Sequence, residues 1–150
     1  MRNKIIFVNK VTITIRVFSA ADEEWLATVS AEEQAEAVRR EQTYQAGRVP
    51  VSVSERQVIL ADDGVATGLT IRAAAQAIAK LKPTKLIIAV PVIASEVKAL
   101  LEQEVDEVVT IVDDEDFLGS VGAYYQDFSQ LSDSDVCTLL DTIDGKENER

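Results

Sequence analysis

The fold class that the sequence predicts is α/β, with a parallel core sheet and helices on both faces. From residue 56 to residue 112, short apolar runs alternate with helical segments, which is the pattern of βαβ units. The apolar runs, among them "QVILA" and "KLIIAVPVI", are continuous, as in strands that are buried on both faces. With 150 residues, of which 47% are hydrophobic, the chain is long enough for one domain with a real core.

The part of the chain before this core is predicted to form a hairpin and a helix. Residues 1–18 contain "IIFV" and "TITIRVF", which are β-branched and aromatic and are expected to pair as two strands. A helix is predicted over 30–46, because Ser30 and Glu33 have capping-box spacing and Gly47 stands just beyond the helix formers. Its charged residues indicate a largely solvated face.

The part after the core is predicted to be irregular at first and then helical. Residues 113–143 begin with an aromatic-rich segment, followed by a helix that Ser132 could cap. The polar residues 144–150 are expected to fray. We therefore expect a single domain over 1–150.

Composition and charge exclude several classes of function. The formal net charge is −11 and there is no histidine, which argues against a nucleic-acid surface and excludes His-based triads and His-based zinc sites. Cys137 is the one cysteine, so no internal disulfide can form. A single cysteine, expected to be a small buried hydrophobe, fits a reducing cytoplasm. No stretch of the sequence is long and apolar enough to span a membrane.

The stretch "VILADDGVATGLT", residues 58–70, carries the strongest functional signal. Asp62 and Asp63 follow a strand, at the end where parallel sheets bind ligands. Gly64 and Gly68 can take positive φ and bring backbone amides close to an anion at the start of the next helix. The turn is neither a Walker loop, which needs a lysine, nor a dinucleotide fingerprint, which needs a third glycine.

Two carboxylates beside a phosphate need partners other than the phosphate itself. Sugar hydroxyls donate hydrogen bonds to carboxylates, and a magnesium ion can link carboxylates to phosphate through water. Ribose 5-phosphate has hydroxyls at one end and phosphate at the other, so the stretch suits a phosphorylated ribose. The predicted substrate-binding residues are Asp62, Asp63, Gly64, Val65, Ala66, Thr67, Gly68, Leu69 and Thr70.

The same stretch resembles the phosphoribosyl pyrophosphate signature of type I phosphoribosyltransferases: four apolar residues, two acids, three variable residues, then Thr, Gly, any residue and Thr. "AVP", "VGAYYQDFSQLSD" and "TYQAGRVP" are similar to one bacterial branch of that family, and the resemblance covers residues 11–140. It implies that the acids hold the ribose hydroxyls, that the loop from Gly64 to Thr70 binds the 5-phosphate, and that Mg²⁺ takes part without direct protein ligands. The implied ligand is phosphoribosyl pyrophosphate or a nucleotide monophosphate, and the implied reaction is transfer of the ribosyl phosphate to a nitrogen base.

The resemblance identifies no catalytic residue. It does suggest a base pocket in the segment near the C-terminus, since related enzymes stack a nucleobase on an aromatic residue there. The candidates are Phe117, Leu118 and Asp127, with the neighbouring Tyr124 and Tyr125. The alternative is that these aromatic residues anchor the segment onto the sheet.

The sequence also departs from the family pattern. Members hold pyrophosphate on an earlier loop that usually contains glycine, whereas the one glycine before Gly64 is Gly47, at a helix end. The chain therefore resembles a member without its pyrophosphate-loop region. It could act as an enzyme, as a non-catalytic ribose-phosphate module, or as a fragment that needs a partner chain. Apolar sheet surface left by a missing strand would favour a homodimer.

Two interpretations outside the family remain for residues 58–70. One is a structural turn between strand and helix with exposed acids. The other is a response-regulator receiver domain, which also ends its first strand with paired acids. A receiver needs a phosphoacceptor aspartate at the end of a later strand, but "LIIAVPVI" ends in Pro91 and apolar residues. We therefore set the receiver aside.

Overall fold

The computed structural model describes the backbone of residues 23–45, 47–48 and 51–148, and the side chains from residue 27 to residue 143 within those ranges. The described residues belong to two compact units, one of residues 51–127 and one that combines the helix before residue 46 with residues 128–148. The predicted hairpin over 1–18 lies outside the described residues. The prediction of a single domain stays a prediction.

The first unit is built on a parallel sheet of three strands in the order β1-β2-β3. The strands are β1 (Gln57–Ala61), β2 (Lys85–Ala94) and β3 (Glu107–Asp114), and β2 is the middle one. Ile59 is in register with Ile87 on β2, and Ala89 is in register with Val109 on β3. The α/β class and the parallel sheet are therefore confirmed, with strand bounds close to those that the apolar runs predict.

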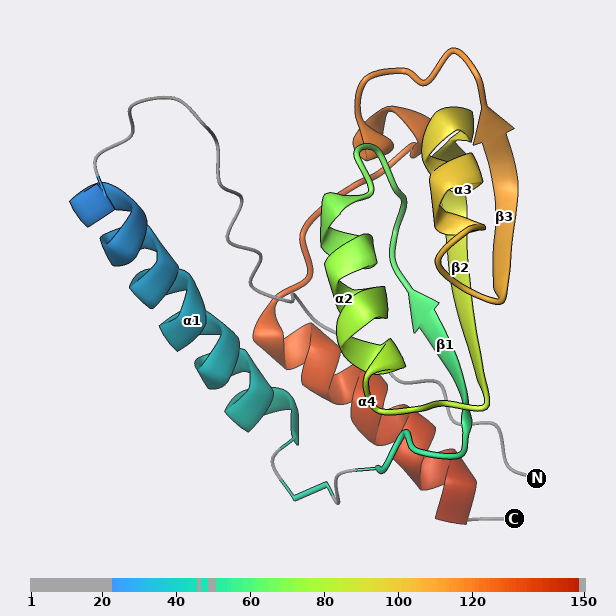
Figure 1. Ribbon diagram of the computed structural model, residues 1–150. Coiled ribbons are helices and arrows are strands. Elements are labelled where there is room, and N and C mark those ends of the chain that lie inside the picture. The colour runs from blue at the N-terminus through green and yellow to red at the C-terminus, as the bar shows by residue number, and fades with distance from the viewer. Residues whose placement is uncertain (1–22, 46, 49–50, 149–150) are drawn as a thin grey trace. The chain divides into compact units, whose positions relative to one another are not determined.

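Two crossover helices, α2 (Leu69–Ala79) and α3 (Ser95–Leu101), connect the strands. Both lie on the same face of the sheet in Figure 1, as expected when two right-handed crossovers advance in one direction across a sheet. The core lies between them and the strands. Its buried members include Val58, Leu60, Ile71, Ala74, Ala75, Ile78, Leu86, Ile88, Val90, Val97 and Leu101.

The opposite face of the sheet is less covered. Alternate residues of the strands point there, and Ala61 and Ala89 are only half-buried. On β3, Val109 is exposed and Ile111 retains 86% of its surface. Within the described residues of this unit, the helices that the sequence predicts for both faces cover only one of them, and apolar side chains of the other face are exposed.

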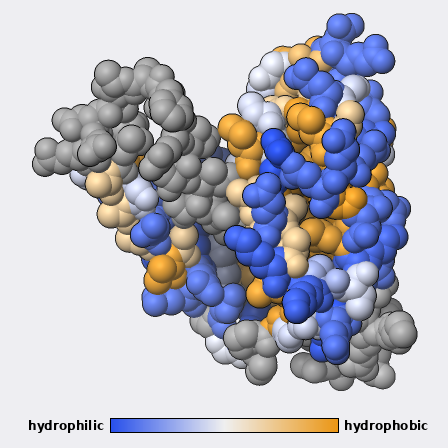
Figure 2. All heavy atoms as spheres, viewed as in Figure 1, coloured by the Kyte–Doolittle hydropathy of each residue, from blue (hydrophilic) through white to orange (hydrophobic). Residues whose placement is uncertain are grey.

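The helix-bearing face is mixed in character. Figure 2 shows hydrophobic residues in orange among hydrophilic residues in blue over α2 and α3. Leu69 on α2 and Leu100 on α3 are among the exposed hydrophobic side chains. In the part of the chain that the structure describes, no helix combines the length and the hydropathy needed to cross a bilayer.

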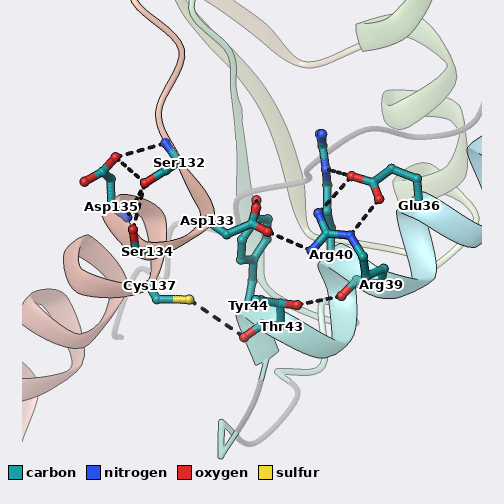
Figure 3. A network of polar contacts seen from close by, with 10 residues as sticks. All are labelled: Glu36, Arg39, Arg40, Thr43, Tyr44, Ser132, Asp133, Ser134, Asp135 and Cys137. Carbon is teal, nitrogen blue, oxygen red and sulfur yellow. Dashed lines mark hydrogen bonds and ion pairs between the residues drawn. The ribbon is translucent and has the colours of Figure 1, made fainter.

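The second unit contains α1 (Glu23–Gln45) and α4 (Asp133–Asn148), which contact each other. Figure 3 shows the polar residues that join them. Asp133 accepts a hydrogen bond from the Tyr44 hydroxyl at 2.6 Å and another from Arg39 at 2.7 Å. Cys137 is half-buried, not fully buried as predicted, and its Sγ lies 3.9 Å from the Thr43 carbonyl oxygen.

The residues predicted to end one of these helices and to cap the other are found at the helix ends. Gly47 follows α1 with φ +76°, as predicted for a helix stop. Ser132 caps α4, because its hydroxyl accepts from the Asp135 amide at 3.3 Å while the Asp135 carboxylate accepts from the Ser132 amide at 2.9 Å. Both predictions are confirmed.

Two predicted boundaries are wrong. The helix predicted over 30–46 begins at Glu23, so Ser30 lies inside α1, because "EEWLATV" contains no helix breaker and continues the helix toward the N-terminus. The tail predicted to fray from residue 144 is helical as far as Asn148. The single glycine at position 145 destabilises the helix by less free energy than the surrounding helix-forming residues contribute.

Candidate functional site

The site begins where β1 ends. Asp62 and Asp63 follow Ala61 directly, and the chain then returns to the sheet at Val65. The Val65 amide donates to the Val92 carbonyl at 2.9 Å, and the Ala94 amide donates to the Val65 carbonyl at 3.2 Å. Because these bonds pin the middle of the turn to β2, the residues on either side of Val65 have a fixed backbone.

The turn delivers the chain into the start of α2. Gly68 is the residue before the helix and has φ +72°, in the left-handed region that favours glycine. Its carbonyl accepts the Arg72 amide at 2.9 Å, which closes the first helical turn. Among the residues that the structure describes, no side chain caps this helix start. The amides of the first turn therefore point their partial positive charge at the solvent side of the loop.

A hollow of about 210 Å³ lies at this place. Of the nine predicted substrate-binding residues, eight line it, and Asp63 does not. The side chain of Asp63 is exposed beside the hollow. Two further residues line it, Ile71 from α2 and Val121 from the segment after β3. The strand-to-helix pattern could have indicated Ile71, but no local signal marks Val121.

Asp62 is the titratable group of the hollow. Its side chain is also exposed, but partial burial raises the pKa of its carboxyl, and the charge of Asp63 adds to that effect. The Asp63 amide donates a hydrogen bond to Asp62 Oδ1 at 3.0 Å, and this bond lowers the pKa of Asp62. The ionised carboxylate of Asp62 therefore destabilises the folded protein. A ligand whose hydroxyl groups donate hydrogen bonds to this carboxylate would offset the destabilisation.

The two glycines of the loop are needed for different reasons. Gly68 combines positive φ with a close contact, since a Cβ there would lie 2.5 Å from Val97 Cγ1. Gly64 does not take positive φ, contrary to one of its expected uses. A Cβ on Gly64 would lie 2.6 Å from Val121 Cγ1 and 2.7 Å from Val92 Cγ1, so tight packing excludes a side chain.

The segment after β3 contacts the acid turn. It contains the short helix η1 (Val121–Tyr124) and then Tyr125, whose hydroxyl donates to the Asp63 carbonyl at 2.5 Å. Burial raises the pKa of Tyr125, and the charges of Asp63 and Asp62 raise it further. The Tyr125 hydroxyl therefore remains a donor at neutral pH.

The residues proposed for a base pocket lie in this segment but do not line the hollow. The Phe117 and Tyr124 rings contact each other with centroids 5.3 Å apart, and Phe117 packs against the core. The Tyr124 hydroxyl donates to Asp114 at 2.6 Å and accepts from the Leu118 amide at 2.9 Å. Leu118 is 61% exposed, and Asp127 is exposed as well. Phe117 and Tyr124 thus serve the packing of the segment.

The acid turn offers few protein ligands to a metal ion. In the ranges that the structure describes, no group of three or more acidic or cysteine side chains could hold a metal ion. Asp62 and Asp63 together offer two neighbouring carboxylates, fewer oxygens than magnesium needs. They fit a magnesium ion only if a ligand and water complete its coordination.

The comparisons with known proteins agree with this geometry. A family model of the phosphoribosyl transferase domain matches residues 7–127. The chain belongs to this family. The match spans the sheet, the acid turn and the Tyr125 segment of this phosphoribosyl transferase domain, so the resemblance carried by residues 58–70 is confirmed at the level of the family.

Individual relatives cover part of the same region. Two proteins of Mycobacterium tuberculosis, from strains CDC 1551 / Oshkosh and ATCC 25618 / H37Rv, are each 34% identical over 103 residues. Their names are "Putative phosphoribosyl transferase MT0597" and "Putative phosphoribosyl transferase Rv0571c". The match covers 69% of this chain and 23% of each relative. This phosphoribosyl transferase domain therefore spans about a quarter of the curated relatives that it matches.

A solved structure supports the fold. The crystal structure of TT1426 from Thermus thermophilus matches with a TM-score of 0.67 at 35% sequence identity. The match covers 80% of this chain and 57% of TT1426. The fold of this phosphoribosyl transferase domain is thus shared with a protein of experimentally known structure.

Proposed function

We propose that residues 62–70 bind a phosphorylated ribose, as phosphoribosyl pyrophosphate or as a nucleotide 5-phosphate. The observation that carries the proposal is the uncapped start of α2 at Gly68, which lines the same hollow as Asp62. An anion at a helix start accepts hydrogen bonds from the free amides and is attracted by the helix dipole. The 5-phosphate would occupy the loop from Gly64 to Thr70, where Thr67 and Thr70 add hydroxyls.

The acid pair fits the other end of this ligand. Ribose hydroxyls are neutral donors, so they can bind carboxylates where a second phosphate would be repelled. Asp62 lies in the hollow and Asp63 lies next to it, so the two carboxylates can receive two neighbouring hydroxyls. The acid pair would thus bind the hydroxyls of ribose 5-phosphate, and the loop with the start of α2 would bind its phosphate.

The reaction proposed for the assembled enzyme is transfer of the ribosyl phosphate to a nitrogen base. The bond from C1 to pyrophosphate breaks with its electron pair leaving on pyrophosphate, a bond from the base nitrogen to C1 forms, and the base gives up a proton. Residues 62–70 would hold the 5-phosphate and the hydroxyls so that C1 stays in line between the leaving group and the base. No protein nucleophile is required, and this chain offers no assigned catalytic residue.

Magnesium and the base belong to the same proposal. Asp62 and Asp63 would hold Mg²⁺ through water. A bound Mg²⁺ ion would neutralise the negative charge of the leaving pyrophosphate. For the base, Leu118 and Asp127 are the candidates with exposed side chains, whereas Phe117 is half-buried against the core.

A second candidate is a non-catalytic ribose-phosphate module, or a chain that turns over only with a partner. The observation in its favour is that Gly47, which ends α1, is the one glycine among residues 1–63, so these residues offer no glycine loop for pyrophosphate. Loss of contacts that stabilise a developing charge costs about 10²- to 10³-fold in rate for each contact. The 150-residue chain by itself would then bind its ligand without turning it over.

The binding proposal is tested by calorimetric titration with ribose 5-phosphate, with and without Mg²⁺. The wild-type chain is expected to bind, and the double variant Asp62→Asn, Asp63→Asn is expected to bind at least about tenfold more weakly, because two charge-assisted hydrogen bonds are lost. Glu115→Gln is the control for the loss of an exposed negative charge outside the turn. No binding to the wild type, or equal affinity of all three proteins, would contradict the proposal.

The two candidates are separated by a turnover assay. The 150-residue chain is incubated with phosphoribosyl pyrophosphate, Mg²⁺ and a mixture of purine, pyrimidine and pyridine bases, and pyrophosphate release is followed. Base-dependent release at an ordinary enzyme rate of about 1 s⁻¹ or more would establish an enzyme. Release at background in a protein that binds ribose 5-phosphate would establish the binding module or the need for a partner.

A further inference from the structure

Tyr125 is a polar side chain through which the segment after β3 reaches the acid turn. Its hydroxyl donates to the Asp63 carbonyl at 2.5 Å, although the two residues are 62 positions apart in the chain. The ring is half-buried. The bond is therefore a tertiary contact between the turn and a different part of the fold.

The peptide groups around Asp63 are fixed on both sides. On the N-terminal side, the Asp63 amide donates to Asp62 Oδ1 at 3.0 Å. On the C-terminal side, its carbonyl accepts the Tyr125 hydroxyl. Since the directions of both carboxylates depend on these two peptide groups, the Tyr125 bond limits how the acid pair can turn.

A second contact holds the same segment against the same turn. Val121 packs on Gly64, where an added Cβ would lie 2.6 Å from Val121 Cγ1. Val121 also lines the hollow. The segment thus touches the turn at Asp63 through a hydrogen bond and at Gly64 through close packing, on consecutive residues.

We propose that Tyr125 is a positioning residue for the acid pair: its hydroxyl holds the Asp63 carbonyl so that the carboxylates of Asp62 and Asp63 face the ribose hydroxyls of the ligand. The inference rests on the proposed function, because it assigns Tyr125 to the ribose end of the same site. It assigns the phosphate end of the ligand to the start of α2, where Gly68 and Thr70 line the hollow.

This division of roles gives a test that a merely structural residue would not pass. The full chain is titrated with two probes, ribose 5-phosphate and inorganic phosphate, as wild type, as Tyr125→Phe and as Tyr124→Phe. Tyr125→Phe keeps the ring and removes the hydroxyl that reaches Asp63. Tyr124→Phe is the matched control, because among the described residues its hydroxyl bonds Asp114 and Leu118 and not the acid turn, and neither probe carries a base.

Tyr125→Phe is expected to weaken ribose 5-phosphate binding about fivefold, the effect of one neutral hydrogen bond, and to leave inorganic phosphate binding unchanged. Tyr124→Phe is expected to change neither affinity. Equal weakening of both probes by Tyr125→Phe, or no weakening of either, would overturn the inference while the proposed function stands. Failure of the wild type to bind ribose 5-phosphate would overturn the proposed function and the inference with it.

Discussion

At the scale of single residues, the two loop glycines show that one residue type can be required for unrelated reasons. Gly68 needs its backbone conformation and its small size, whereas Gly64 needs only its small size. Gly119 provides the third case, with φ +85° and no atom within 4 Å of an added Cβ. Alanine substitutions at these three positions can therefore separate two contributions to the loss of stability, the strain of a left-handed backbone and the overpacking of an added side chain.

Gly68→Ala is expected to lower the free energy of unfolding by about 2–4 kcal/mol, the sum of a left-handed residue and an overpacked side chain. Gly119→Ala has the same kind of φ without the clash and is expected to cost about 1 kcal/mol. Denaturant unfolding of both variants measures the difference. Equal losses would show that Val97 moves away from residue 68 without cost.

Asp62 illustrates a site residue that works against stability. Because burial raises its pKa in the folded state, the folded protein binds the proton more tightly than the unfolded chain does, and stability falls as pH rises above 3.8, the ordinary value. Asp62→Asn should therefore raise the free energy of unfolding at pH 7. The gain should shrink as the pH falls below 3.8, where the wild-type carboxyl is neutral in both states. A gain that is equal at pH 7 and in acid below the ordinary pKa would contradict this account.

At the scale of elements, polar side chains join α1 to α4. Asp133, at the start of α4, receives bonds from Arg39 and Tyr44 of α1, while Arg48 forms an ion pair with Asp141 further along α4 (Figure 3 shows the Asp133 end). Hydrogen bonding from Arg39, and then from Tyr44, lowers the pKa of Asp133. Isolated exposed pairs contribute little, but Asp133 has two partners on one helix.

Asp133→Asn is expected to lower the thermal unfolding midpoint near neutral pH, because the charge that attracts Arg39 is lost. Since the folded-state pKa is depressed, the stabilisation is present above 3.8 and is lost as the pH falls through the lowered value, so wild type and variant should converge in acid. Glu41→Gln, an exposed change on α1, is the control and should leave the midpoint unchanged. A midpoint that Asp133→Asn does not lower at neutral pH would contradict a stabilising role for the cross-link.

At the scale of the whole molecule, the exposed apolar side chains of β3 call for a covering partner. Val109 and Ile111 lie on the face of the sheet opposite to α2 and α3, and Ile111 is 86% exposed. Large apolar patches are uncommon on the surface of monomers. A second copy of the chain is one surface that could bury them.

We therefore expect the chain, whose mass is 16.4 kDa, to sediment as a homodimer. Ile111→Glu should shift the distribution toward monomer, because dimerisation would bury an unpaired charge. Leu81→Glu is the control, since Leu81 is exposed in the connection after α2 and not on β3. A wild type that remains monomeric at high concentration in sedimentation equilibrium would contradict the expectation.

The sequence by itself determined the features that depend on near neighbours. The strand β1 coincides with "QVILA", the other strands and crossover helices fall within a few residues of their apolar runs, and Ser132 and Gly47 mark helix ends as their local chemistry requires. The signature in residues 58–70 indicated the family for the same reason, since a loop that cradles an anion is built from consecutive residues. Local signals failed at Ser30, where a capping pattern occurs inside a longer helix.

Only the tertiary structure decided what depends on residues far apart in the chain. That Gly64 is packed between Val92 and Val121, and that Tyr125 holds the Asp63 carbonyl, cannot be read from either partner, because each contact arises where the segment after β3 folds back over the turn after β1. The placement of both crossover helices on one face follows from the strand order, which the alternation of runs does not specify. Local pattern fixes which residues form an element, but packing over long sequence distances fixes which elements meet.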